Sequence, residues 1–370
     1  MSTAPFHGVE TLLREVSDFN SKVAAGVEKL SKIKDADVQI ATAPKDEILR
    51  TDKVTLHRYR PVTETRFNTP VLVIYSLIGR HTMTDLQEDR SLVRNLLAQG
   101  VDLWVVDWGN ASRADRWLTI DDYVLGYLDD CVTAMCEATG QSKIGMLGIC
   151  EGGTFALAYA ALEPERVQHL ALTITPVDFH ADLASDVSEQ GFINVWTRSL
   201  ADEDVDRMID VWGVLPGEFM SAIFSMMTPI RSLTKYNLDL LDVVDDEQKL
   251  LNFLRMEKWL ADRPHHAGEA AKQWLKDLYQ QNKLIRNEWE LGGRKVDLRQ
   301  ITMPVLNIYA ESDTIVPPLT SRALQGTVGT DDYTELGLRG GHIGVFVSSK
   351  SQGIVGQGIA DWLAERDNPG

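Results

Sequence analysis

A short segment of the chain places a cysteine between glycines at a spacing that suits nucleophilic catalysis. Residues 148–153 read GICEGG; an apolar run precedes them and a helical period follows. A nucleophile on a tight strand-to-helix turn needs small neighbours, because the turn is strained and crowded. The first N–H groups of the helix then point at the thiolate and stabilise it. We therefore predict that Cys150 is a nucleophile, rather than the inert packed residue that a free cysteine usually is.

Partners for such a nucleophile follow later in the chain, in the order nucleophile, acid, histidine. His342, in the segment RGGHIG, lies after the last predicted strand and before the last helix. Asp313 follows the apolar run PVLNIYAE and alone would be interpreted as a turn or helix-cap aspartate. Because a cysteine needs a base and the base needs an orienting acid, we predict Cys150, Asp313 and His342 as catalytic residues. Glu311 and Asp178 are weaker candidates for the acid.

Acyl transfer also needs N–H groups that stabilise a developing oxyanion. The backbone N–H of Glu151, directly after the nucleophile, is the first expected donor. The second should come from the loop that follows the apolar run 71–77, and we assign it to the backbone of Ile78.

The remaining cysteines and histidines are interpreted as structural or exposed. Cys131 and Cys136 lie in a helical period, on or near its apolar face, and should pack there. The adjacent His265 and His266 are interpreted as the solvated start of a helix. The other histidines are either structural or carry no signal: His7, His57, His81, His169 and His180.

The elements that would position these residues alternate between strands and helices. Apolar runs predict strands at 71–77, 102–108, 143–148, 167–175, 304–311 and 332–337. Helical periods separate them at 89–100, 120–140, 154–165 and 353–366. This alternation indicates a mostly parallel sheet with helices on both faces. The alternating run 54–60 predicts a further strand at an exposed edge.

The alternation stops between about residue 180 and residue 295. That stretch has mostly helical periods, is rich in Trp and Met, and shows no clear strand. We expect a helical cap whose apolar side chains form its core or line a tunnel. A parallel sheet with such an insertion is the plan of the α/β-hydrolase fold. The predicted organisation is an N-terminal helix and connector (1–50), a catalytic core (51–180 and 296–370) and a cap (181–295).

Composition narrows the remaining classes of function. The 370 residues include 37 Lys and Arg and 54 Asp and Glu, and the resulting net charge of −17 argues against nucleic acid as a partner. Three cysteines make no disulfide framework, and no metal-binding or nucleotide-binding motif occurs, so we expect neither a metal nor a cofactor. Without a signal sequence or a transmembrane run, a cytoplasmic protein is expected.

Several segments together resemble the class III polyhydroxyalkanoate (PHA) synthases. They are MTDLQEDRSLVRNLLAQG (83–100), VVDWGNASRADRWLTIDDY (105–123), LGICEGG (147–153), TPVDF (175–179), NIYAESDTIVPP (307–318) and GGHIGVFVSSK (340–350). The resemblance covers most of the chain. The chain's length points to class III, whose short catalytic subunit works with a second subunit, PhaE.

The resemblance implies a complete reaction. Cys150 would be the acylated nucleophile, His342 its base, and Asp313 would help to activate the 3-hydroxyl of the incoming monomer. The substrate would be an (R)-3-hydroxyacyl-CoA, foremost 3-hydroxybutyryl-CoA, and the products polyester and free CoA. The family also implies a homodimer or a hetero-oligomer with PhaE, attached to PHA granules.

Glu151 departs from the family pattern, in which the residue after the nucleophile is usually neutral and in class III often Gln. A carboxylate beside the thiolate would disfavour the charged form of the thiol, unless the side chain points elsewhere. We expect activity to survive this departure.

Two other functions would use the same residues differently. A cysteine-dependent hydrolase of this fold, such as a thioesterase or a dienelactone-hydrolase-like enzyme, would pass the acyl group to water instead of an alcohol. A non-catalytic granule-binding subunit would not need an intact set of catalytic residues. The resemblance favours the synthase over both.

Overall fold

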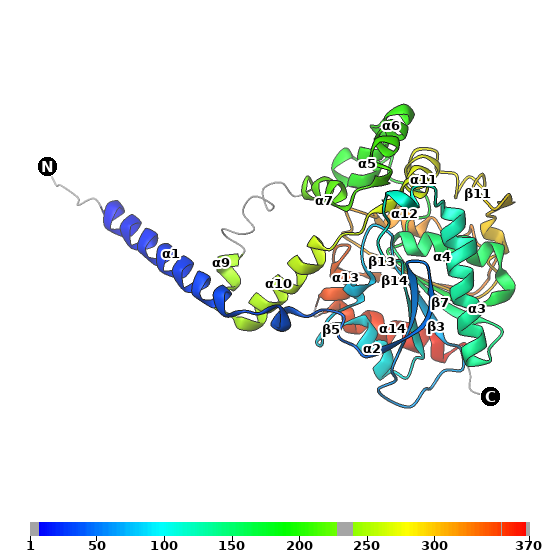
Figure 1. Ribbon diagram of the computed structural model, residues 1–370, viewed down its shortest axis with the longest axis horizontal. Helices are drawn as coiled ribbons and strands as arrows, with labels where there is room; N and C mark the ends of the chain where they lie inside the picture. The colour runs from blue at the N-terminus through cyan, green and yellow to red at the C-terminus, as the bar shows by residue number, and fades with distance from the viewer. Residues whose placement is uncertain (1–6, 228–239, 349, 368–370) are drawn as a thin grey trace.

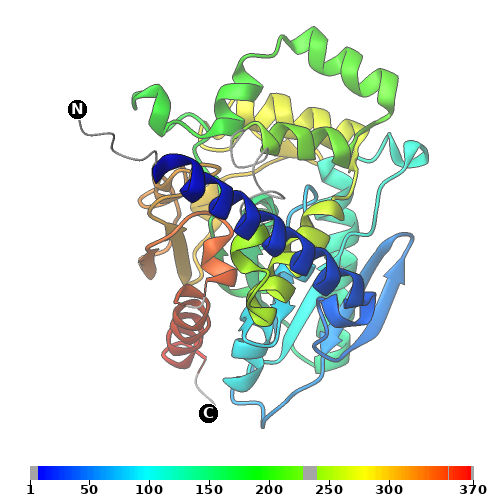
Figure 2. The same ribbon diagram turned by 90° about the vertical axis from the view of Figure 1, so that its left-hand side faces the viewer.

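The chain folds around one large sheet, seen in a computed structural model that describes residues 7–227, 240–348 and 350–367 (Figures 1 and 2). Its eight strands have the order β1-β2-β6-β3-β7-β8-β13-β14. Their bounds are β1 (Lys45–Thr51), β2 (Val54–Tyr59), β3 (Val71–Ile74), β6 (Leu103–Asp107), β7 (Ile144–Ile149), β8 (Val167–Thr173), β13 (Val305–Ala310) and β14 (Tyr333–Leu338). Neighbours from β6 to β14 pair in parallel, whereas β1 and β2 are antiparallel. The predicted mostly parallel sheet is confirmed.

Helices cover both faces of this sheet, as predicted (Figure 1). One face carries α2 (Leu92–Ala98), α13 (Gly344–Val347) and α14 (Ser351–Ala364); the other carries α3 (Leu128–Thr139) and α4 (Glu151–Leu162). Side chains of β3 alternate between the two apolar layers. Val71 and Val73 pack in the layer of α14, and Leu72 and Ile74 pack in the layer of α4. This period of two is what buries a strand on both faces.

The antiparallel edge of the sheet differs from the prediction. β1 lies in the segment expected to be a connector, and its pairing makes β2 an interior strand rather than the exposed edge. The sequence of β1, KDEILRT, leaves most of its side chains exposed or half-buried. Such a strand is held mainly by its backbone ladder, so it shows no apolar run that could be recognised in the sequence.

The insertion between β8 and β13 is mostly helical. Its helices are α5 (Phe192–Arg198), α6 (Asp202–Trp212), α7 (Gly217–Ser225), α9 (Leu240–Val243), α10 (Glu247–Ala261), α11 (Gly268–Gln273) and a π-helical stretch at Trp274–Gln280. Of these, α5, α6, α7 and α11 lie beyond one end of the sheet, whereas α9 and α10 lie at the side of the body beside the N-terminal helix (Figures 1 and 2). The expectation of no strand was wrong. Two short antiparallel pairs occur, β9 (Val214–Leu215) with β10 (His266–Ala267), and β11 (Glu290–Leu291) with β12 (Arg294–Lys295). Two-residue ladders are too short to produce an alternating pattern.

The aromatic side chains of the cap mainly form its core. Trp259, Trp274 and Trp289 are buried, and Met220 is buried with them. Met226 is 63% exposed, and Trp196, Trp212 and Met227 are half-buried. The interpretation of these bulky side chains as packing therefore holds for most of the described positions.

The N-terminal helix α1 (His7–Lys32) extends away from the body of the molecule beside α9 and α10 (Figures 1 and 2). Lys29 Nζ donates to the carbonyl of Val244 at 2.8 Å, so the end of α1 is fastened to the segment after α9. A helix was predicted in this N-terminal part of the chain. None of the described helices is long and apolar enough to cross a membrane.

Candidate active site

Cys150 sits on a strained turn between β7 and α4. Its backbone has φ 54° and ψ −128°, a conformation that costs energy for any residue with a Cβ atom. Backbone hydrogen bonds hold the turn in place: the Cys150 N–H donates to Thr173 O at 3.0 Å, and the Gly153 N–H donates to Cys150 O at 2.9 Å. The side chain is therefore presented at the start of α4, at the carboxyl end of β7.

The glycines around Cys150 are required by crowding. A Cβ atom on Gly152 would lie 2.2 Å from the carbonyl oxygen of Ile74, and one on Gly148 would lie 2.5 Å from the Cα of Gly153. Neither contact can be relieved by moving a flexible side chain, because both involve backbone atoms. The spacing of glycines that identified this segment therefore has a direct steric cause.

His342 and Asp313 form a close pair at the same edge of the sheet. His342 follows β14, Asp313 follows β13, and His342 Nδ1 lies 2.7 Å from Asp313 Oδ2. The other carboxylate oxygen, Oδ1, accepts the N–H groups of Ile315 at 2.8 Å and Val316 at 2.9 Å. Asp313 is buried, and both of its carboxylate oxygens are engaged by these contacts.

The second side of His342 faces Cys150. Burial of the ring lowers the pKa of His342, but the charges of Asp313 and Cys150, and hydrogen bonds to both, outweigh it and raise the pKa to about 10. The ring therefore carries its proton at neutral pH next to the sulfur. Such an imidazolium favours the thiolate, which is the reactive form of a cysteine.

The weaker candidates for the acid lie elsewhere. Glu311 is exposed, and Asp178 is engaged by neighbours in the cap junction: its Oδ1 accepts from Asn282 Nδ2 at 2.7 Å and from the His180 N–H at 2.9 Å. It is Asp313 whose carboxylate meets His342.

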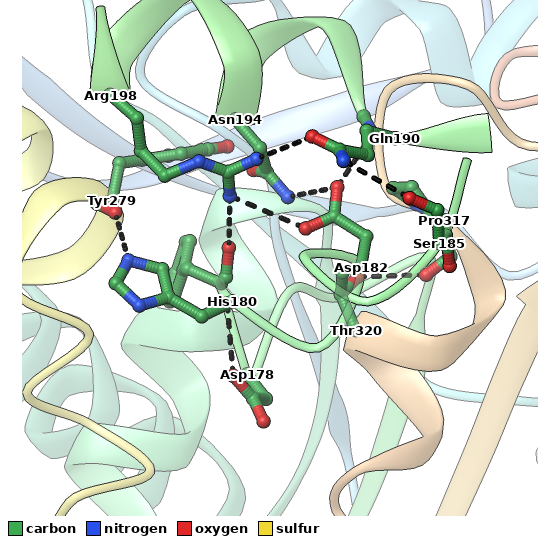
Figure 3. Close-up of polar contacts among 12 residues, drawn as sticks. Asp178, His180, Asp182, Ser185, Gln190, Asn194, Arg198, Tyr279, Pro317 and Thr320 are labelled. Atoms are coloured by element: carbon green, nitrogen blue, oxygen red, sulfur yellow. Dashed lines mark hydrogen bonds and ion pairs between the residues drawn. The ribbon is translucent and has the colours of Figure 1, made fainter. Parts of the chain in front are cut away.

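The loop that carries Asp313 is braced by the first segment of the cap (Figure 3). Asp182, wholly buried, accepts from the Gly191 N–H at 2.7 Å and from Asn194 Nδ2 at 2.9 Å, with Arg198 Nη1 at 3.3 Å. The N–H of Phe192, directly after Gly191, donates to Thr314 O at 3.1 Å. The residue next to Asp313 is thus held by a turn that Asp182 organises.

The predicted oxyanion donors lie in a hydrogen-bonded cluster around the Glu151 side chain. Glu151 Oε2 accepts from the Leu77 N–H at 2.9 Å and from Ser76 Oγ at 3.1 Å. The N–H of Ile78, the predicted second oxyanion donor, donates to Ser76 Oγ at 3.0 Å and is therefore engaged within the loop in this structure. The Glu151 backbone is the first residue of α4, the position from which an N–H can point at the oxyanion.

His266 was predicted to be solvated, and that prediction was wrong. It is 1% exposed, and its Nε2 lies 3.0 Å from Oε1 of Glu151, which is 2% exposed. No pattern near His266 announces this contact, because its partner is 115 positions away. The sequence feature that could have indicated this contact is Glu151 itself. A carboxylate at the start of a helix that is buried on every side needs a hydrogen-bond donor, and the local sequence does not supply one.

The other two cysteines pack in the core, as predicted. Cys131 is buried in the layer of α3, and Cys136 packs against the same layer. Burial and the charge of Asp130 raise the pKa of Cys131 to about 12, which keeps that thiol protonated. Within the described ranges, no group of three or more His, Cys, Asp or Glu side chains is arranged to hold a metal ion.

Comparison with known proteins defines the class first. A family model described as alpha/beta hydrolase fold matches residues 69–348. Among solved structures, a putative non-heme bromoperoxidase, BpoC, from Mycobacterium tuberculosis superposes with a TM-score of 0.50 at 14% identity, covering 86% of this chain and 98% of that one. The chain therefore has the α/β-hydrolase fold that the strand and helix pattern predicted.

More specific similarity identifies the family. A model described as the N-terminus of poly-beta-hydroxybutyrate polymerase (PhaC) matches residues 4–96. The poly(3-hydroxyalkanoate) polymerase subunit PhaC of Synechocystis sp. is 45% identical over 97% of this chain and 94% of its own length. The same subunit of Allochromatium vinosum is 42% identical over 96% and 98%. The chain belongs to the PhaC family of poly(3-hydroxyalkanoate) polymerases, which are acyltransferases, and the predicted resemblance is confirmed.

Proposed function

We propose that this chain is a class III PHA synthase that polymerises (R)-3-hydroxyacyl-CoA, foremost 3-hydroxybutyryl-CoA. One observation carries the proposal: His342 joins the buried Asp313, at 2.7 Å, to Cys150 on its strained turn. This arrangement supplies a nucleophile, a base and an orienting acid within one hydrogen-bonded chain. Membership of the PhaC family supports the substrate class.

In the first step the Cys150 thiolate attacks the thioester carbonyl of the substrate. The tetrahedral oxyanion is stabilised by backbone N–H groups, of which the Glu151 N–H is the first candidate. Collapse of this intermediate breaks the carbon–sulfur bond to CoA and leaves the acyl group on Cys150. The CoA thiolate leaves with a proton from His342, so the step exchanges one thioester for another of nearly equal energy.

In the second step a 3-hydroxyl group attacks an acyl group held on a cysteine. His342, now neutral, removes the hydroxyl proton as the ester bond forms and the cysteine sulfur leaves. Both oxygens of Asp313 are already engaged, one by His342 and one by two backbone N–H groups. We therefore propose that Asp313 activates the hydroxyl through His342 rather than by direct contact.

Transfer to an alcohol requires that water be kept from the acyl-enzyme. Cys150 is only 9% exposed, and the buried Tyr279 of the cap lies close enough for the charge of Cys150 to raise the tyrosine pKa. Burial is the larger cause of that shift, which takes the pKa of Tyr279 well above its usual value and leaves its hydroxyl neutral. This covered site favours an acceptor that the protein delivers over bulk water.

The remaining parts of the proposal rest on the family. The CoA thioester is the substrate, and the acyl transfer needs no cofactor or metal beyond the side chains named. We propose a PhaE subunit as partner, in a homodimer or hetero-oligomer, and a cytoplasmic enzyme that works at the surface of PHA granules.

The test is release of CoA from (R)-3-hydroxybutyryl-CoA, with and without a PhaE subunit, followed by analysis of the acyl product. We expect polymer and free CoA from the wild type and neither from Cys150→Ala. Free 3-hydroxybutyrate in place of polymer would make the protein a thioesterase. Absence of CoA release from the wild type under both conditions would contradict the proposed substrate.

A further inference from the structure

Glu151 and His266 form a buried carboxylate–histidine pair that the reaction described above does not use. The two side chains are 2% and 1% exposed, and Glu151 Oε1 lies 3.0 Å from His266 Nε2. Resting on the proposed acyl transfer by Cys150, we propose that Glu151 is a positioning residue. Its carboxylate holds the 76–78 loop against the turn that carries Cys150, and His266 ties that loop to the cap.

The first step of the argument is a chain of hydrogen bonds. The Ile78 N–H donates to Ser76 Oγ, Ser76 Oγ–H donates to Glu151 Oε2, and the Leu77 N–H donates to the same oxygen. Ser76 and Leu77 therefore bind Glu151 Oε2 directly, and Ile78 is linked to the same oxygen through the Ser76 hydroxyl. The N–H groups of Leu77 and Ile78 are thus both engaged, and a single side chain holds the loop against the start of α4, where Glu151 is the first residue.

The second step is the count of protons in the pair. His266 Nδ1 lies 3.2 Å from Ala267 O, and a carbonyl oxygen can only accept, so Nδ1 carries a hydrogen. Glu151 Oε1 and His266 Nε2 must share one further proton, because two lone pairs at 3.0 Å would repel each other. A Gln at position 151 would satisfy the same partners without that proton, with its oxygen toward Leu77 and its NH₂ toward His266.

The third step is that the cap makes further hydrogen bonds to the segment that follows β3. Arg263 Nη1 donates to Ile78 O at 2.8 Å, and Trp259 Nε1 donates to Arg80 O at 3.1 Å. Burial lowers the pKa of Arg263 to about 10, which leaves it charged at neutral pH. Trp259 and Arg263 of the cap therefore bind the segment 76–80 directly, and His266 binds it through Glu151. A displaced cap would carry the loop away from the start of α4.

The first experiment compares Glu151→Met with Glu151→Gln. Met fills the same space but leaves the Leu77 N–H, the Ser76 hydroxyl and His266 without a partner. We expect kcat for CoA release to fall on the order of 10²-fold, the cost of misplacing groups beside the nucleophile, with little change in KM. Glu151→Gln should restore kcat to nearly the wild-type value. Pre-steady-state CoA release separates rate from folding, because the burst amplitude counts intact sites and the rate constant reports their chemistry.

Asp367 provides a matched control far along the chain. Its buried carboxylate also accepts one backbone N–H, from Thr69 at 2.9 Å, and one hydroxyl, Thr69 Oγ1, at 2.9 Å. Asp367→Leu should lower thermal stability while the rate constant per intact site stays at the wild-type value. An equal fall of that rate constant in Asp367→Leu and Glu151→Met would overturn the proposal.

The cap side is tested with His266→Leu, which removes the donor, and His266→Gln, which keeps one. We expect a reduced kcat in the first and near-normal kcat in the second, and this pair suffices if Glu151→Met does not fold. Because His266 acts through Glu151, the double variant Glu151→Met/His266→Leu should lose no more than Glu151→Met alone. The inference would be overturned if the kcat loss of the double variant equalled the product of the two single-variant losses, or if Glu151→Met were fully active. An inactive wild type would instead indicate failure of the proposed function.

Discussion

Two carboxylate–histidine pairs border Cys150, and they have the same chemistry but different surroundings. In the catalytic pair, Asp313–His342, the ring nitrogen that does not meet the carboxylate faces the sulfur, and the side chain of His342 is 14% exposed. In the supporting pair, Glu151–His266, that nitrogen faces the carbonyl of Ala267, and His266 is 1% exposed. The two histidines therefore differ in what their second ring nitrogen faces. His342 faces the sulfur of Cys150 and can exchange a proton with it, whereas His266 faces a carbonyl oxygen and can only hold its position.

The second carboxylate oxygen shows the same division of labour. In both pairs it accepts two donors from a loop: Ile315 and Val316 of its own loop for Asp313, and Leu77 and Ser76 of the loop after β3 for Glu151. Each carboxylate thus orients a histidine with one oxygen and a loop with the other. The catalytic pair orders the loop after β13, and the supporting pair orders the loop after β3, so the two pairs hold opposite walls of one site.

The largest expected effect comes from replacing each histidine by glutamine. His342→Gln removes the base, and kcat/KM for CoA release should fall by about 10²- to 10⁴-fold. His266→Gln keeps a donor for Glu151 and should stay close to wild type. Steady-state CoA release on both variants, at matched stability, measures the gap. Equal losses would mean that the two pairs have the same role and would break the comparison.

The next largest effect comes from replacing each carboxylate by its amide. Asp313→Asn removes the charge that holds the proton on His342, and kcat should fall by about 10²-fold or more, as for other orienting acids. Glu151→Gln should remain within a few-fold of the wild type, in either direction. Rates of CoA release for the two variants provide the measurement. A Glu151→Gln enzyme far more active than the wild type would show that the carboxylate impairs the neighbouring thiolate.

The sheet, and the meeting of Cys150, Asp313 and His342 at one edge of it, could be predicted because their signals are local. Apolar runs mark β3, β6, β7 and β13, and the carboxyl ends of parallel strands meet at one edge of the sheet. Residues that follow such strands, as Cys150, Asp313 and His342 do, are therefore brought together by topology alone. The glycines beside Cys150 add a steric signal that the close approach of Ile74 explains.

The supporting pair could not be predicted because each of its contacts joins distant segments. His266 lies on a two-residue strand, and its neighbour His265 is half-exposed, so the local sequence fits a solvated helix start equally well. The strand β1 was missed for a related reason, since its polar side chains give no period. The segment 120–140 was predicted as one helix, but its first part, Asp122–Tyr127, is π-helical, and the two periods differ too little to separate by eye.

A smaller effect is expected from adding a methyl group to glycines in two helices. In Gly152→Ala the new Cβ would meet the Ile74 carbonyl at 2.2 Å, just before the loop that Glu151 holds. The free energy of unfolding should fall by about 1–3 kcal/mol, the usual cost of overpacking. Gly353 lies exposed on α14 with no atom near its Cβ position, and Gly353→Ala should add about 0.5–1 kcal/mol. Urea unfolding measures both. A neutral Gly152→Ala would show that the turn yields, and rigid positioning by Glu151 would then be untenable.

The last expected effect is a dependence of stability on pH that belongs to the Asp313–His342 pair. The pKa of His342 is raised to about 10 in the folded chain, from an ordinary value near 6.5 in the unfolded chain. The folded state therefore binds more protons between those values. The stabilisation is complete below about pH 6.5 and is lost as the pH rises toward 10, with a slope of at most about 1.4 kcal/mol per pH unit.

His342→Gln removes this contribution together with the coupling of His342 to Asp313 and Cys150. We expect the difference in unfolding free energy between wild type and His342→Gln to shrink as the pH is raised from 7 to 10. Asp313→Asn removes the charge that favours the protonated ring, so its stability should follow the shallower profile of His342→Gln. Parallel pH profiles for the wild type and both variants would mean that His342 is not held as an imidazolium. The distinction between a proton-carrying pair and a supporting pair would then have to rest on the position of Cys150 alone.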